Sequence, residues 1–549
     1  MRRQRWRGWG LLLVMLALPA AQAAAEASGG EVVTPLSAAE TFTTVAALLE
    51  GSFRDYPREA LRRARQAAEG DRPEPARDLA RQALISALES IAARVPVPGV
   101  AGQSPVDGRR LPVASLVVFN PLSWERSDLV RCRVALRPGQ AHGLRVLDPT
   151  GAPVPSQLAA VERHGGGSLK AAELLFIARQ VPPLGYRAFT LVPTWESGDP
   201  PAPARAPASY ESHFYRVLFA HGGLNSLYDK ALKRELLQPE QLLGGEVLLR
   251  RPGSDGPGAF YRLSRDRPWW IAVEHGPVRH RFQWEQATPH GRVRQRLSLY
   301  PNLKRVDLET TLLEGNPASG PECHLAFPLR IPSAHITFAT PTGVVRVSPD
   351  DYHQPPGSST FRPGVPRWVT VGDGRFSVTL SPGTTQWEAT EAVGVPLPYP
   401  ILQPVLPEPV AGDDCDYRVS LTSHRGGWER GWRAGAEADS PLLAVCSPVV
   451  EGPRPLPPAA SFLRVAPGNA LLCSLRKSEE DDSLLLRCRE MLGKPARARL
   501  ELFWPVRSAW HAGQAGAERP LRVEGRRVRL RLGAHAVTTV RLSLRAAAP

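Results

Sequence analysis

The chain has 549 residues, 42% of them hydrophobic and 22% charged, so wholesale disorder is excluded and two to four domains of roughly 100–200 residues are expected. The formal net charge is +15, but only six of the 68 basic residues are lysines, and the arginines are scattered among Pro, Ala and Gly. Because no run of five to eight Lys and Arg residues occurs, we expect no nucleic-acid partner.

The N-terminal residues predict a secretory signal peptide over residues 1–23. Four arginines precede an apolar stretch at 11–18, and Ala21-Gln22-Ala23 gives the small-x-small pattern of a cleavage site. The apolar residues are fewer than the roughly 20 that a membrane span needs, although an uncleaved anchor is the alternative. We therefore expect an exported protein, periplasmic or extracellular, without a stable membrane span.

Residues 31–97 predict a short helical bundle. Ser37 followed by Glu40 is a capping-box pattern that opens a first helix, and Pro57 stands where a first-turn proline opens a second one. A third helix is predicted by apolar residues at i, i+3 and i+4 spacing, which are Ala76, Leu79, Ala80, Ala83, Leu84, Ala87, Leu88 and Ile91.

From about Val113 the apolar residues follow the period of two that is typical of strands. The segments are 115–119, 129–135, 174–178, 214–219, 292–299, 305–312, 377–380, 498–502, 527–532 and 537–544. Pro-rich stretches at 198–208 and 449–458 divide the region. We predict a mainly β fold of antiparallel β-sandwiches. Its parts are a small β-domain over 113–197, a large β-sandwich over 209–448 and a C-terminal β-sandwich over 459–545.

The C-terminal part of the chain contains the nearest approach to a basic run. Arg526 and Arg527 are followed by Arg529 and Arg531, an alternation typical of the outer face of a strand. We therefore expect these arginines to face solvent rather than to track a phosphate backbone.

Two cysteines in this part are candidates for a disulfide. Cys473 and Cys488 lie in apolar segments on either side of an acidic turn at 479–482. If the two segments pair as a hairpin, the cysteines face each other across it. Because exported proteins can oxidise their cysteines, we predict a cross-strand disulfide between them.

No established catalytic or metal-binding motif occurs in the sequence. It contains no His-x-His, His-Glu-x-x-His, Cys-x-x-Cys or Gly-x-Ser-x-Gly pattern, and no phosphate-binding glycine loop. Adjacent acidic residues at 350–351 and 413–414 are typical of solvated turns. Glycoside hydrolysis needs two carboxylates roughly 5–9.5 Å apart across the bond, which neighbours in one loop do not provide. We therefore assign no catalytic residue and no metal ligand.

Tryptophan pairs point instead to carbohydrate binding. Trp269 and Trp270, and separately Trp428, can present flat apolar faces to the C–H patches of sugar rings. Arg267, just before the first pair, can donate hydrogen bonds to hydroxyl groups. We predict these four residues as carbohydrate-binding, with burial of the indole rings in a β core as the competing expectation.

Several segments also resemble a known family. The run Val117-Val118-Phe119-Asn120-Pro121-Leu122-Ser123-Trp124-Glu125-Arg126 closely resembles the segment that opens the C-terminal β region of glycoside hydrolase family 38 α-mannosidases. Segments at 182–186, 222–230, 367–375 and 475–487 resemble later motifs of that family in the same order. The resemblance covers about residues 113–545. It implies a galactose-mutarotase-like supersandwich with smaller β-sandwiches, preceded by the remnant of a helical bundle.

The same resemblance implies what this chain lacks. The family hydrolyses α-mannosides with retention, using zinc and an aspartate nucleophile carried mainly on an N-terminal barrel of roughly 250 residues. Fewer than 100 residues separate the signal peptide from Val113, and they are predicted to be helical. Arg54 stands where the bundle of the family has a metal-binding histidine, and arginine cannot ligate zinc. We therefore expect neither the barrel nor a cofactor.

Three functions are compatible with these observations. The chain is expected to be an exported α-mannosidase-like protein that binds carbohydrate, including mannosides, without cleaving it. One alternative is the β-subunit of a split α-mannosidase whose barrel is a separate chain. The other is a structural envelope protein that uses the sandwiches for different contacts.

Overall fold

The computed structural model describes most of the chain from residue 33 onward. The described residues are 33–54, 56–69, 73–96, 114–196, 201–240, 242–250, 260–288, 291–313, 322–331, 334–340, 343–347, 367–381, 383, 386–390, 401–406, 415–448, 454–512 and 518–545. The predicted signal peptide at 1–23 lies outside them. No helix among the described residues is long and apolar enough to cross a membrane.

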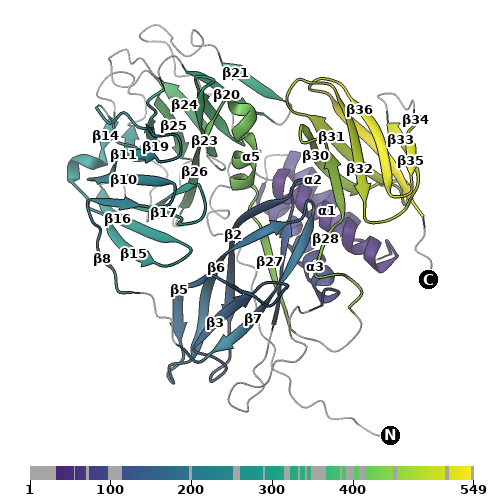
Figure 1. Ribbon diagram of the computed structural model, residues 1–549, viewed down its shortest axis with the longest axis horizontal. Coiled ribbons are helices and arrows are strands. Elements are labelled where there is room, and N and C mark those ends of the chain that lie inside the picture. Colours follow the sequence, from purple (N-terminus) through teal and green to yellow (C-terminus); the bar gives the residue numbers. More distant parts are fainter. Residues whose placement is uncertain are drawn as a thin grey trace.

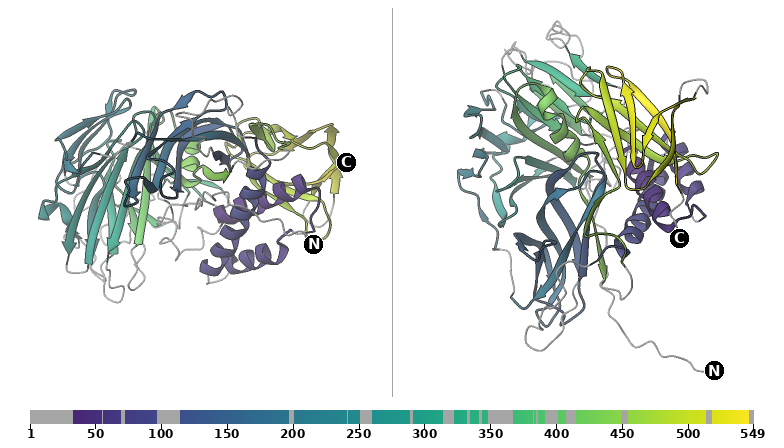
Figure 2. Two further views of the ribbon diagram at one scale, coloured as in Figure 1. Left: turned by 90° about the horizontal axis from the view of Figure 1, so that it is seen from below. Right: turned by 45° about the vertical axis from the view of Figure 1, so that its right-hand side comes forward.

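Three helices open the described chain, α1 (Val33–Glu50), α2 (Arg58–Glu69) and α3 (Pro73–Ala93). Most of the described part of the apolar stripe predicted on the third helix is buried, with Ala80, Leu84 and Leu88 all at most 4% exposed. This stripe shares a core with Phe119 and Tyr186 of the small β-domain. Figure 2 shows the three helices grouped together beside the C-terminal β-sandwich.

The start of α1 differs from the prediction. The helix begins at Val33, so Ser37 lies inside it rather than at its cap. The Ser37 hydroxyl donates to the backbone carbonyl of Cys473 at 3.0 Å, and Glu40 accepts from Arg65 at 2.5 Å. The capping-box prediction is therefore wrong, because both side chains bind other segments rather than their own helix end.

The small β-domain consists of two sheets that enclose one core. The first sheet contains β1 (Ala114–Asn120), β3 (Gly143–Leu147), β4 (Pro153–Val154), β7 (Gly185–Thr194), β27 (Leu443–Pro448) and β28 (Ala459–Ser461). The second sheet contains β2 (Arg126–Ala135), β5 (Ser156–Arg163) and β6 (Leu169–Val181). The central strand β1 pairs with β7 on one side and with β27 on the other. Strand β27 comes from the end of the range predicted for the large β-sandwich, so this domain is completed by residues more than 300 positions away.

The large β-sandwich is built from three antiparallel sheets. The ten-stranded sheet contains β8 (Ala204–Arg205), β15 (Ile271–His275), β16 (His280–Thr288), β17 (Gly291–Leu299), β18 (Val306–Leu313), β20 (His335–Ala339), β21 (Val344–Val347), β22 (Val369–Gly372), β23 (Phe376–Ser381) and β26 (Cys415–Arg425). The four-stranded sheet contains β9 (Ser209–Glu211), β10 (Tyr215–Ala220), β11 (Gly223–Asp229) and β12 (Arg234–Glu235). The five-stranded sheet contains β13 (Glu246–Arg250), β14 (Phe260–Arg262), β19 (Glu322–Pro328), β24 (Gln386–Thr390) and β25 (Ile401–Leu406). All three contribute to one hydrophobic core.

The C-terminal β-sandwich has a four-stranded and a five-stranded sheet around a separate core. The first contains β29 (Leu463–Ala466), β32 (Ala496–Leu502), β35 (Arg522–Glu524) and β36 (Arg527–Leu532). The second contains β30 (Ala470–Lys477), β31 (Leu484–Glu490), β33 (Val506–Ala512), β34 (Glu518–Pro520) and β37 (Val537–Leu544). In Figure 1 this sandwich is the yellow part at the right.

Helix α5 (Trp428–Asp439) lies between the large and the C-terminal β-sandwiches (Figure 1). A Cβ atom at Gly435 would lie 2.5 Å from the Cβ of Trp368, so only glycine lets the helix approach the sheet this closely. The aromatic residues of α5 share a small core with Trp124 and with Met491 of the C-terminal sandwich. The predicted mainly β fold with an N-terminal helical bundle is thus confirmed.

Candidate functional site

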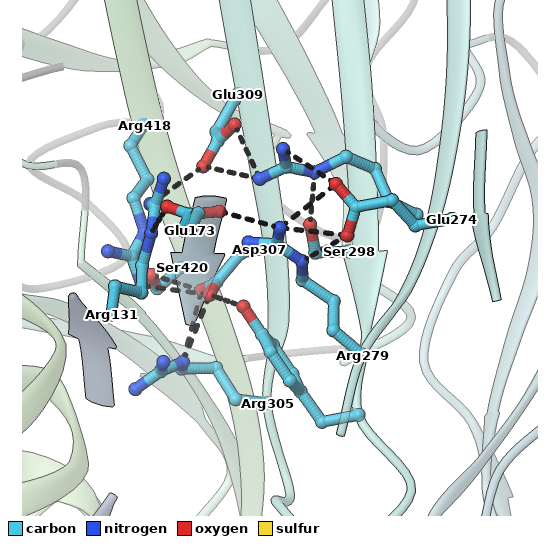
Figure 3. A network of polar contacts seen from close by, with 12 residues as sticks. Arg131, Glu173, Glu274, Arg279, Ser298, Arg305, Asp307, Glu309, Arg418 and Ser420 are labelled. Carbon is cyan, nitrogen blue, oxygen red and sulfur yellow. Dashed lines mark hydrogen bonds and ion pairs between the residues drawn. The ribbon is translucent and has the colours of Figure 1, made fainter. Parts of the chain in front are cut away.

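A buried network of charged side chains joins the small β-domain to the large β-sandwich (Figure 3). Its members come from β2 and β6 on one side, and on the other from β15, β16, β18, β26 and the turns that precede β16 and β18. The arginines are Arg131, Arg279, Arg281, Arg305 and Arg418, and the carboxylates are Asp128, Glu173, Glu274, Asp307 and Glu309. Arginines of each domain therefore meet carboxylates of the other at the interface.

Each carboxylate in the centre of this network is held by arginines. Glu173 accepts from Arg131 at 2.8 Å and from Arg279 at 3.0 Å. Burial alone would raise the pKa of the Glu173 carboxyl, but these two guanidinium groups outweigh it and lower the pKa to about 2. For Glu309, burial is again outweighed, and Arg281 and Arg131 lower its pKa to about 2.

Both carboxylate oxygens of Asp307 likewise accept hydrogen bonds from neighbouring side chains. One carboxylate oxygen accepts from Ser420 at 2.5 Å, and the other accepts from Tyr300 at 2.5 Å and from Arg418 at 2.8 Å. Despite burial, Arg305 and Arg418 hold the pKa of Asp307 far below its usual range. A carboxylate whose oxygens are all engaged and which stays ionised is not free to transfer protons. Asp307 contacts the small β-domain only indirectly, because its partner Arg305 also binds Asp128 at 2.9 Å.

The structure separates the two adjacent tryptophans that were predicted to bind carbohydrate. Trp270 is fully buried in the large core, where its Nε1–H donates to the carbonyls of Ala220 and Gly223. Its neighbour Trp269 is only partly buried. The prediction for Trp270 is therefore wrong, because successive residues of an extended segment point to opposite faces and Trp270 takes the inner one.

Trp428 lies at the start of α5 and is half-buried. Its ring stacks on that of Trp368, with centroids 5.8 Å apart and an interplanar angle of 17°. Trp432, one turn later, is buried and contacts Trp124 edge to face. One face of the Trp428 ring is thus used for packing between elements, and its predicted role in carbohydrate binding stays a prediction.

Trp269 belongs to a partly exposed apolar surface at the edge of the large β-sandwich. Ile271 follows it by two residues, is 44% exposed and pairs directly with Arg205 of β8. The Arg205 guanidinium lies over the Trp269 ring, 5.3 Å from its centroid. The His221 ring contacts Trp269 at 5.0 Å. We call these residues, with Arg267, whose carbonyl oxygen contacts His221, the Trp269 surface.

Strand β14 and the turn that follows it lie just before Trp269 in the sequence. Tyr261 is 44% exposed, and its hydroxyl donates to Asp266 at 2.5 Å, which fixes the ring and raises the pKa of Tyr261 above its usual 10.0. Arg267 has an exposed side chain and a φ of +57°. Its carbonyl oxygen lies 2.8 Å from Nδ1 of His221. Tyr261 and Arg205 were not predicted from the sequence, although period two in Phe260-Tyr261-Arg262 places Tyr261 on the opposite face from its two neighbours.

The predicted disulfide between Cys473 and Cys488 is absent, because both cysteines are free thiols. Their strands do pair as a hairpin, but a β-bulge between Leu472 and Ser474 shifts the register. The residue directly opposite Cys488 is consequently Leu472. Burial raises the pKa of both thiols, so neither is a ready nucleophile in the folded protein. The prediction failed because a bulge cannot be read from hydrophobic alternation.

The described residues do not offer a set of ligands that would fit zinc. Within the described part of the chain, no group of three or more His, Cys, Asp or Glu side chains could hold a metal ion. Arg54, at the position where the resembled family has a histidine ligand, is an exposed residue in the turn after α1. A guanidinium group has no lone pair to offer a cation.

Comparison with solved structures identifies the fold. A protein in glycosyl hydrolase family 38 from Enterococcus faecalis has a TM-score of 0.71 and 14% sequence identity, over 95% of this chain and 71% of that chain. An α-mannosidase from the same organism has a TM-score of 0.68 and 15% identity, over 95% of this chain and 68% of that chain. A galactose mutarotase-like protein from Lactobacillus casei matches 39% of this chain at a TM-score of 0.29 and 13% identity, covering 99% of its own chain.

Searches at the sequence level find no relative. No protein-family model matches the chain, and no curated protein matches it. The chain therefore shares the fold of family 38 α-mannosidase structures along nearly its whole length, at sequence identities of 14% and 15%. The predicted resemblance is confirmed at the level of the fold.

Proposed function

We propose that this chain is an exported, α-mannosidase-like protein that binds neutral carbohydrate, including mannosides, and does not cleave it by itself. The fold likeness to an α-mannosidase supports the choice of carbohydrate as ligand. The residues described before β1 form three helices, so the proposal assigns the described chain a binding role. The proposed export rests on the signal-peptide pattern at 1–23.

The observation that carries the proposal is the Trp269 surface. Tyr261 and Ile271 are two of the six large hydrophobic residues that are exposed among those described, and they flank Trp269 in sequence. Aromatic and aliphatic faces beside Arg267 and Asp266 suit a sugar, because a sugar ring combines C–H patches with hydroxyl groups. Displacing Arg205 from the Trp269 ring costs about 0.5–1 kcal/mol, so this contact does not close the surface.

Binding to neutral glycans, measured with the full chain, tests the proposal. We expect a glycan array and titration with a mannose oligosaccharide to show binding that Trp269→Ala weakens by about tenfold or more, the loss of one aromatic contact. Trp195→Ala is the matched control, since Trp195 is 39% exposed in the small β-domain, away from this surface. Equal binding by Trp269→Ala and wild type would assign the ligand to another surface.

A second candidate is one part of a split α-mannosidase. More than a quarter of each matched Enterococcus chain lies outside the alignment, which leaves room for a partner. The exposed large hydrophobic residues, however, lie on strands and loops of the described chain and not on α1 to α3. Turnover of an aryl α-mannoside, by the chain alone and after addition of a barrel protein, separates the two proposals. If no neutral glycan binds and no turnover occurs, a structural envelope role is favoured.

A further inference from the structure

The outer face of the four-stranded sheet in the C-terminal β-sandwich is lined with arginines. Strands β32 and β36 alternate strictly, so that Ala498 and Leu530 point into the core while their neighbours face solvent. The solvent-facing arginines are Arg497 and Arg499 on β32, Arg529 and Arg531 on β36, and Arg522 on β35. The sequence analysis predicted that Arg529 and Arg531 face solvent, which is confirmed.

The register of this sheet places like charges opposite each other. Arg497 pairs with Arg531, and Arg499 pairs with Arg529, which in turn pairs with Arg522 on its other side. Like charges directly opposite on one face of a sheet destabilise it. Glu524 relieves only the pair of Arg522 and Arg529, and a repeated arrangement of like charges is expected where a ligand of opposite charge relieves it.

These arginines line a groove rather than a flat surface. The hollow has a volume of about 1220 Å³ and is bordered by Ala466 and Pro467 on one side and by His511 and Arg519 on the other. Small-molecule sites are usually about 300–1,000 Å³. A groove of this size therefore suits several units of a polymer better than one small anion.

Most of the positive charge in the groove is uncompensated. Glu524 pairs with Arg522 at 2.8 Å and with Arg529 at 3.0 Å. Among the residues that the structure describes, the other four groove arginines have no ion pair or hydrogen bond from their guanidinium groups; they are Arg497, Arg499, Arg519 and Arg531. Guanidinium groups bind carboxylates, sulfates and phosphates through paired N–H donors, so their unused donors define the chemistry of the ligand.

We propose that this groove binds an anionic polysaccharide, a sugar chain that bears carboxylate or sulfate groups. Arginines that alternate along one strand are about 7 Å apart. The groove also lacks the aromatic rings on which single-stranded bases stack, since no Trp, Tyr or Phe is among its lining residues. Sparse charge without stacking rings fits an acidic glycan.

This inference goes beyond the proposed function and does not rest on it. The arginine groove and the Trp269 surface belong to different sandwiches with separate cores. Failure of neutral glycans to bind would refute the role of the Trp269 surface alone. Failure of acidic glycans to bind would refute the groove alone.

Titration of the full chain with polygalacturonate, heparin and a neutral mannan tests the groove. The first two probes distinguish carboxylate from sulfate recognition, and an oligothymidylate tests nucleic acid. The double variant Arg499→Gln/Arg531→Gln removes two unpaired groove charges and is expected to weaken binding of the preferred acidic glycan about ten- to hundredfold. The variant should keep or raise its melting temperature, because it removes one charge from each of two like-charged pairs.

The matched control removes the same amount of charge elsewhere. Arg137→Gln/Arg179→Gln alters two exposed arginines of the small β-domain and should leave binding within about twofold of wild type. The proposal is overturned if both double variants weaken binding equally, because general attraction then explains it. It is also overturned if neither acidic glycan binds, or if the oligothymidylate binds more tightly than both at equal salt.

Discussion

Replacement of Glu309 by glutamine tests whether the buried network holds the small β-domain on the large β-sandwich. Glu309 accepts from Arg281 of the same sheet at 3.1 Å and from Arg131 of the small β-domain at 3.4 Å. Its side chain is only 13% exposed. Glutamine keeps the shape of the side chain but removes the charge, so the change isolates the electrostatic contribution.

The expected loss follows from the pKa of Glu309. Its pKa is about 2 in the folded protein, against an ordinary value of 4.5. That difference corresponds to about 3 kcal/mol of unfolding free energy at neutral pH. The figure agrees with the roughly 3–5 kcal/mol lost when one partner of a buried ion pair is removed. Arg131 and Arg281 each keep a second carboxylate, Glu173 and Glu274, which favours the lower end of this range.

The contribution of Glu309 to the unfolding free energy depends on pH in a direction that its pKa determines. The folded-state pKa lies below the unfolded one, so the contribution is fully present above the unfolded value of 4.5 and is lost as the pH falls toward 2. Wild type and Glu309→Gln should therefore differ by about 3 kcal/mol in urea unfolding at neutral pH, and by progressively less below about pH 4.5. Tryptophan fluorescence reports the transition, since the chain contains 13 tryptophans.

The control for this experiment is an exposed glutamate. Glu125 lies in the turn between β1 and β2, is exposed, and has no ion pair among the described residues. Glu125→Gln should change the unfolding free energy by less than about 0.5 kcal/mol. If Glu309→Gln behaves like this control at neutral pH, or if its effect does not diminish in acid, the network does not stabilise the interface as argued.

Three further predictions follow from the same structure. Trp270→Ala should cost about 3–5 kcal/mol and Trp269→Ala much less, because only Trp270 is fully buried; melting temperatures of the two variants check this. Asn120→Ala should cost about 2–4 kcal/mol in chemical denaturation, because the buried amide of Asn120 donates to the carbonyls of Trp124 and Pro182, which the variant leaves unpaired. Cys473 and Cys488 should react with a thiol reagent only slowly in the native protein and readily after unfolding without reductant, whereas recovery of these thiols only after reduction would restore the predicted disulfide.

Local patterns in the sequence predicted much of the architecture. The stripe of Leu84 and Leu88 predicted α3, and period two predicted strands such as β36 with its arginines on the outer face. Both patterns express the geometry of one element against one core, so they can be read without knowing its neighbours. The same reasoning failed for Cys473, because a bulge changes the register without changing the alternation on either side.

The candidate sites depended on the tertiary structure to a much greater degree. Trp269 and Trp270 are equivalent in sequence, and only the packing of the segment before β15 against the core makes one partly accessible and the other buried. Arg205 lies in a stretch that the sequence analysis assigned to a linker, yet it covers the Trp269 ring. Their proximity depends on how distant strands pair, which composition and spacing do not encode.

The sequence by itself determined helices such as α3 and the solvent-facing side of strands such as β36, because those follow from side-chain periodicity over a few residues. Only the tertiary structure decided that β27 completes the sheet of β1, that Glu309 meets Arg131 and that Arg497 lies opposite Arg531. These contacts join segments that are many residues apart, and each is selected by burial of a shared core rather than by any local preference.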